Sequence, residues 1–161
     1  MEILREPRVT LIARPQFLEP GHLPVSWKGE ATDGERLAEF AGRLCYMSQR
    51  NPAGRTTADY LRNILQQGHG SVFEHSQYVV LIEGISRSCS HELVRHRAGW
   101  GWSQLSQRYV DESHAAFVMP PAIIGDAQLE AEWTAQVTAA QAAYVKAVER
   151  LMARDAGVAD A

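Results

Sequence analysis

A chain of 161 residues in which 45% are hydrophobic and 22% are charged has ordinary globular composition, which argues against intrinsic disorder. This length predicts a single domain over residues 1–161 and excludes two domains of ordinary size. The formal net charge of −3 argues against a general polyanion binder, so any anion site must be built locally.

The two cysteines, Cys45 and Cys89, indicate the compartment. Neither belongs to a CxxC pair, which argues against a disulfide scaffold and against a cysteine zinc site, and a reducing cytoplasm is expected. No apolar run approaches the roughly 20 residues that span a bilayer. The charged N-terminal segment lacks the apolar core of a secretory signal.

The first half of the chain predicts one strand and two helices. Residues 9–13 (VTLIA) are typical of a strand, and Thr32 with Glu35 resembles a capping box that opens a helix over 35–47. The apolar positions of this helix recur at helical spacing: Leu37, Phe40, Ala41, Leu44 and Cys45. Residues 57–67 predict a second helix, with Tyr60, Leu61, Ile64 and Leu65 on one face and Gly68 as its stop.

The second half predicts a strand over 77–82 (QYVVLI), then a helix that starts at Ser86 or Ser88 and runs to about His96. A short apolar stretch over 117–119 follows, and then a long amphipathic helix from 126 to about 154. Strands and helices are interspersed without regular βαβ alternation. We therefore expect an α+β fold, with a small mixed or antiparallel sheet, packed helices and one long C-terminal helix.

The helix after the second strand carries unusual charge. If residues 85–97 are helical, Arg87, His91 and Arg95 share one face at four-residue steps. The opposite stripe is apolar, with Ile85, Cys89 and Leu93, and His96 is expected to be packed or turned at the helix end. From 84 to 109 there are four arginines and one glutamate, a net charge of +3.

Guanidinium groups bind phosphate well because their planar fork makes bidentate contacts. The segment therefore suggests a site for anions, although a solvated surface helix explains the same pattern. The loop at Gly99 and Gly101 lets the backbone approach a ligand closely. Trp100 and Trp102 would stack on a planar ring there, or else pack in the core or at a subunit contact.

Metal chemistry is not expected. HELVRH resembles HExxH, but His91 and His96 are five residues apart, about 140° around a helix, and cannot converge on one zinc as an i, i+4 pair does.

Three ordered segments together resemble the flavin-dependent thymidylate synthase family: GHGSVFEH (68–75), GISRSCSHELVRHR (84–97) and SQLSQRYV (103–110). The family signature is RHR, seven or eight residues, then serine, and here Arg95 to Arg97 are followed by eight residues and Ser106. The resemblance implies transfer of a methylene from methylenetetrahydrofolate to dUMP. FAD supplies the electrons and NADPH recharges the flavin.

The resemblance also implies site residues. FAD would be bound by Ser71, Arg95, His96, Arg97 and Gln104. The residues expected to bind dUMP are Arg87, Glu92, Leu93, Val94, Arg95, Gln104, Leu105, Ser106, Gln107 and Arg108. Ser106 is expected to be a ligand contact and not a nucleophile, since no histidine or lysine in its segment is placed to take its proton.

Family members continue past the end of this chain, and their sites are built across subunits of a homotetramer. The arginine that activates the uracil is expected in the absent part, so no catalytic residue is assigned within 1–161. Two alternatives remain: a nucleotide- or flavin-binding module that lacks catalysis, and a single-strand nucleic-acid binder that uses the basic face.

Overall fold

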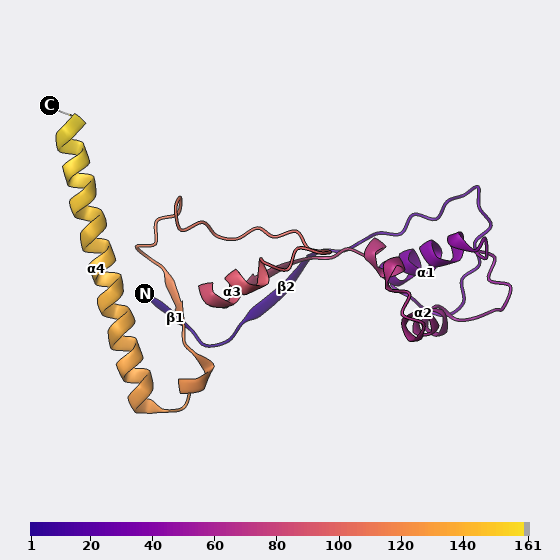
Figure 1. The fold of residues 1–161 in the computed structure, drawn as a ribbon, viewed down its shortest axis with the longest axis horizontal. Helices are drawn as coiled ribbons and strands as arrows, with labels where there is room; N and C mark the ends of the chain where they lie inside the picture. Colours follow the sequence, from indigo (N-terminus) through magenta and orange to yellow (C-terminus); the bar gives the residue numbers. More distant parts are fainter. Residues whose placement is uncertain (160–161) are drawn as a thin grey trace. The chain divides into compact units, whose positions relative to one another are not determined.

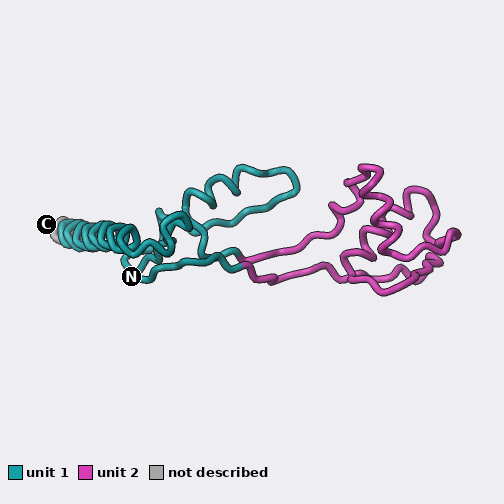
Figure 2. The backbone as a smooth tube through the Cα atoms, turned by 90° about the horizontal axis from the view of Figure 1, so that it is seen from below, with its two compact units in different colours: residues 1–8, 82–161 teal, residues 9–81 magenta. Residues whose placement is uncertain are grey.

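The computed structural model describes residues 1–159, with side chains through Asp155, and divides into two compact units (Figure 2). Unit 1 contains residues 1–8 and the chain from Ile82 onward, and unit 2 contains residues 9–81. In chain order the elements are β1 (Glu2–Leu4), β2 (Arg8–Ala13), α1 (Asp33–Cys45), α2 (Thr57–Gln66), η1 (Gly70–His75), β3 (Val79–Glu83), α3 (Arg87–Leu93), β4 (Ala116–Val118), η2 (Pro121–Ile123) and α4 (Ala127–Ala159) (Figure 1).

The ends of α1 and α2 are set by local sequence. The Thr32 side chain accepts from the Glu35 backbone N–H while the Glu35 carboxylate accepts from the Thr32 N–H, which confirms the predicted capping box. At α2, Thr56 is the N-cap. Gly68 lies just beyond its C-terminus at φ +70°, and His69 donates to the Ile64 carbonyl. Gly68 therefore ends α2 as predicted.

The core of unit 2 lies where α2 meets α1. Ala38 of α1 is buried with Tyr60, Leu61 and Ile64 of α2, and Val72 and Phe73 of η1 pack against them. Burying each large apolar side chain contributes about 1.5–3 kcal/mol.

The buried face of α1 differs from the apolar stripe that its spacing predicts. Leu44 and Cys45 are exposed, and the buried positions of α1 are Gly34, Ala38, Glu39, Gly42 and Arg43. The reason is close packing, because a side chain at Gly42 would meet the Tyr60 hydroxyl at 2.5 Å. Ala38 and Gly42 therefore leave room for Tyr60 of α2, and the Arg43 guanidinium lies 4.3 Å from the centre of the Tyr60 ring.

Unit 1 is built around a two-stranded parallel sheet. Its strands β1 and β4 pair with Ile3 opposite Phe117, although the N-terminal strand was not predicted from the sequence. Arg5 donates to both Glu130 carboxylate oxygens and so ties the segment after β1 to α4. Helix α4 begins at Ala127 and extends beyond its predicted end, to Ala159.

The second sheet pairs β2 with β3. The α+β class is confirmed, with two small sheets and a long C-terminal helix. The single domain expected from chain length stays a prediction. None of the helices described within residues 1–159 is both long enough and apolar enough to cross a membrane.

Candidate functional site

The charged helix is shorter than predicted. Ser86 caps α3 by accepting from the Cys89 N–H, and the helix ends at Leu93 instead of His96. The backbone N–H groups of Arg95 and His96 then donate to the backbone carbonyls of Glu92 and Leu93, three residues earlier in each case. The chain therefore tightens into a turn. Arg87 and His91 keep their four-residue spacing on α3, but Arg95 does not continue that face.

The exposure of this segment also differs from expectation. His96, expected to be packed or turned at the helix end, has an exposed side chain. Cys89 is exposed instead of lying on a buried apolar stripe, while Leu93 and Val94 are half-buried. Arg95 and Arg97 are exposed, and among the described residues neither takes part in a salt bridge. Two guanidinium groups are thus open to solvent immediately after α3.

Two hydrogen bonds hold the segment 103–108 against α3. Arg87 donates from Nη2 to the Leu105 carbonyl over 2.9 Å, and Gln104 donates from Nε2 to the Ser90 hydroxyl. The first bond joins two residues that the sequence predicts for the dUMP site, and the second joins the predicted Gln104 to Ser90, which was not predicted. The half-buried Arg87 is therefore partly committed to positioning this segment, with its remaining N–H groups available for other acceptors.

The end of the segment 103–108 is shaped locally. The Ser106 hydroxyl accepts from the Arg108 backbone N–H at 3.3 Å, which is consistent with a structural or ligand-contact role. The Arg108 guanidinium lies over the Tyr109 ring, 5.3 Å from its centroid. Glu92, Leu105, Gln107 and Arg108 are exposed.

Ser71 belongs to unit 2, whereas the other predicted site residues belong to unit 1. It is an exposed residue of η1, whose neighbours Val72 and Phe73 anchor that turn to the core of unit 2. The motif at 68–75 thus combines apolar anchors with polar groups that face solvent.

Sequence reasoning missed two positioning residues. Ser90 was given no role, yet it accepts from Gln104. Gly84, at φ +70°, lies so close to the N-terminal segment that a Cβ would meet the Glu6 carbonyl oxygen at 2.5 Å. A glycine directly between a predicted strand and helix was the available signal for such a close approach.

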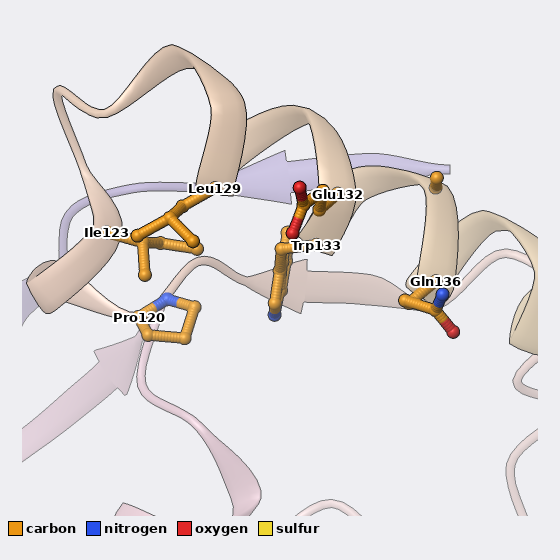
Figure 3. Close-up of a pocket in the computed structure, with 7 residues that line it drawn as sticks. Pro120, Ile123, Leu129, Glu132, Trp133 and Gln136 are labelled. Atoms are coloured by element: carbon orange, nitrogen blue, oxygen red, sulfur yellow. The ribbon is translucent and has the colours of Figure 1, made fainter.

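A separate open hollow lies at the start of α4 (Figure 3). None of the predicted site residues lines this hollow. Its lining is mostly apolar and consists of Pro120, Ile123, Leu129, Glu132, Trp133, Ala135 and Gln136. Within the described part of the chain, no three histidine, cysteine, aspartate or glutamate side chains come together in a way that could hold a metal ion.

Comparison with known proteins agrees with the motifs. Residues 29–158 match the family described as thymidylate synthase complementing protein. Over 149 residues the chain is 50% identical to a flavin-dependent thymidylate synthase of Mycobacterium sp. strain JLS, 48% to that of Mycolicibacterium gilvum and 47% to that of Mycobacterium bovis. Each alignment covers 91% of this chain and 58% of the relative, so the chain spans little more than half the length of these proteins.

Proposed function

The chain belongs to the thymidylate synthase complementing protein family, and we propose that it carries the signature-bearing part of a flavin-dependent thymidylate synthase. The reaction is the reductive methylation of dUMP to dTMP. A methylene carbon passes from methylenetetrahydrofolate to C5 of the uracil, the C5 proton is lost, and FAD with NADPH supplies the reducing equivalents. The observation that carries this proposal is the pair of hydrogen bonds joining α3 to the segment 103–108.

The residues expected to bind dUMP are Arg87, Glu92, Leu93, Val94, Arg95, Gln104, Leu105, Ser106, Gln107 and Arg108. Among them, Arg87, Arg95 and Arg108 supply positive charge for the phosphate, and the amides of Gln104 and Gln107 suit the polar edge of a uracil. The link from Arg87 to Leu105 supports this role, since it draws two of the predicted contacts together.

The chemistry of the exposed groups fits FAD. Ser71, Arg95, His96, Arg97 and Gln104 would hold the flavin, with the two solvent-open guanidinium groups offering contacts to its pyrophosphate. The bound flavin would supply the electrons, and the protein's own groups would bind and orient the anionic ligands. A flavin route also removes the need for a cysteine nucleophile, and both cysteines here lie in helices.

We further propose that the protein is a cytoplasmic homotetramer with sites shared between subunits. Support for association comes from β2, whose apolar residues Val9, Leu11 and Ile12 are each more than half exposed. Exposed apolar side chains grouped on one short strand favour burial against further protein. Two free, exposed cysteines are in keeping with a reducing compartment.

The test supplies the chain with FAD, NADPH, methylenetetrahydrofolate and dUMP labelled with tritium at C5. We expect both FAD and dUMP to bind, because the residues proposed for both ligands lie within this chain. Flavin-dependent release of tritium into water would show in addition that these residues suffice for catalysis. Binding of FAD and dUMP without release would instead identify a nucleotide- and flavin-binding module that lacks catalysis. Failure to bind either ligand at micromolar protein would overturn the proposal.

A further inference from the structure

Two tryptophans behind α3 form a stacked pair. The Trp100 and Trp102 ring centroids are 5.2 Å apart and the planes differ by 13°. Trp102 is half-buried and donates from Nε1 to the His96 carbonyl over 2.8 Å. Trp100 is 58% exposed. The inner ring is therefore anchored to the backbone, and the outer ring presents apolar aromatic surface to solvent.

The loop around this pair is open. Gly99 has φ +76°. The backbone N–H of Trp100 donates to the Arg97 carbonyl over 3.2 Å, and this bond closes the turn that carries the two indoles. A Cβ built at Gly99 or at Gly101 would meet no atom within 4 Å. Space beside the backbone thus adjoins the exposed ring.

The surroundings of the pair favour an anion. Between Leu93 and Val110 the sequence contains three arginines and no aspartate or glutamate. Arg95 and Arg97 precede the loop and are exposed, with no salt bridge to other described residues. A ligand stacked on Trp100 would therefore find guanidinium groups nearby along the chain for its negatively charged substituents.

We propose that Trp100 is a stacking platform for the planar heteroaromatic ring of an anionic cosubstrate, with Trp102 as its positioning residue. The cosubstrate class rests on the proposed function. That function requires methylenetetrahydrofolate, a pterin with carboxylates, and NADPH, a pyridine dinucleotide with phosphates. Either molecule combines a flat ring for the indole face with anionic groups for the arginines. Removing one aromatic partner from such a stack weakens binding by roughly tenfold or more.

The experiment measures dissociation constants of the full chain by calorimetry for four separate probes: folic acid, NADPH, FAD and dUMP. Trp100→Ala is compared with Trp100→Phe, which keeps a ring, and with Trp27→Phe as the matched control. Trp27 lies in unit 2, where it contacts Phe17 and donates to Glu19. Trp102→Phe tests positioning, because it keeps a ring while removing the donor to His96.

We expect Trp100→Ala to raise the dissociation constant of folic acid or of NADPH at least tenfold. The dissociation constants of dUMP and FAD should stay within twofold of those of the parent. Trp100→Phe should recover most of the loss. The probe whose binding Trp100→Ala weakens identifies the cosubstrate. Three results would overturn the platform. These are equal binding of both cosubstrates to Trp100→Ala and to the parent, no binding of either cosubstrate to the parent, and loss of FAD binding alone in Trp100→Ala.

The two proposals fail differently. A parent chain that binds neither FAD nor dUMP but binds folic acid or NADPH in a Trp100-dependent manner refutes the proposed function and retains the platform. Binding of FAD and dUMP with no effect of Trp100→Ala on either cosubstrate refutes the platform alone.

Discussion

Ser90 illustrates how a residue without an expected ligand role can position those that have one. Its hydroxyl accepts from Gln104, and Gln104 lies in the segment that is expected to contact both dUMP and FAD. Together with the bond from Arg87 to Leu105, this contact holds the segment against α3. One hydrogen bond contributes about 1 kcal/mol, which corresponds to roughly fivefold in an equilibrium constant.

We therefore predict that Ser90→Ala weakens dUMP binding about fivefold, measured by calorimetry at fixed salt. Ser88→Ala is the control, since Ser88 is an exposed neighbour on the same helix. The two variants should have the same melting temperature within about 2 °C. Equal dUMP affinity in both variants would show that the link from Gln104 to Ser90 does not shape the site.

At the scale of elements, α1 contains a buried ion pair. Arg43 donates from Nε to a Glu39 carboxylate oxygen, both side chains are at most 4% exposed, and the guanidinium also lies 4.3 Å from the centre of the Tyr60 ring. Removing one member of a buried pair leaves an uncompensated charge, which costs about 3–5 kcal/mol.

Glu39→Ala should accordingly lower the free energy of unfolding of unit 2 by about 3–5 kcal/mol in urea titrations. Arg62→Ala, which removes an exposed pair with Asp59, should cost less than about 1 kcal/mol. The double variant Glu39→Leu with Arg43→Met should recover much of the loss, because it leaves no unpaired charge. A Glu39→Ala cost as small as that of Arg62→Ala would contradict the burial seen here.

The contact between Arg5 and α4 makes the stability of unit 1 depend on pH. The hydrogen bonds from Arg5, with a further one from the Gly125 N–H, lower the pKa of Glu130 from 4.5 to about 2. A carboxyl whose pKa is lowered on folding stabilises the protein above its unfolded pKa. That stability is lost as the pH falls through the folded value.

The stability advantage of the parent over Glu130→Gln should therefore be full above about pH 5 and shrink as the pH falls from 4.5 toward 2. Urea midpoints measured at intervals across this range report it. Glu149→Gln, at an exposed position of the same helix, is the matched control for replacing one glutamate of α4 by glutamine. A difference that stays constant down to pH 2 would rule out the linkage.

Sequence patterns predicted these elements unevenly, for physical reasons. The caps at Thr32 and Gly68 were predictable because they depend on residues within a few positions of each other. The end of α3 at Leu93 was not, since nothing in the helical spacing of 85–97 marks where backbone bonds tighten into a turn. The pairing of β1 with β4 joins strands of three residues more than a hundred positions apart, beyond any local signal.

At the scale of the whole molecule, the motifs identified the family, but the arrangement of the site depends on contacts that spacing does not encode. The RHR signature and its serine were visible in the sequence, whereas the bond from Arg87 to Leu105 depends on how a loop folds back. Likewise, helical spacing predicted Leu44 on the apolar face of α1, but packing of Tyr60 against Gly42 selected a different face.

The pairing of β2 with β3 bears on assembly. Every residue of β2 is exposed, including Leu11 at 53% and Ile12 at 60%, and these two successive residues of the strand point to opposite faces of the sheet. A two-stranded sheet alone is marginally stable in water, so exposed apolar residues on both of its faces favour burial against further protein. A symmetric homo-oligomer is the common way to provide that cover.

We predict that the chain sediments as a homo-oligomer at micromolar concentration and that Leu11→Glu shifts it toward the monomer. The reason is that a charge at a buried interface costs several kcal/mol unless it is paired. Leu18→Glu is the control, because Leu18 is 76% exposed in the loop outside the strands. Far-ultraviolet circular dichroism should show that both variants keep their helices. A parent chain that sediments as a monomer at every concentration would mean that β2 needs no cover from a second copy, and the proposal of shared sites would lose its physical basis.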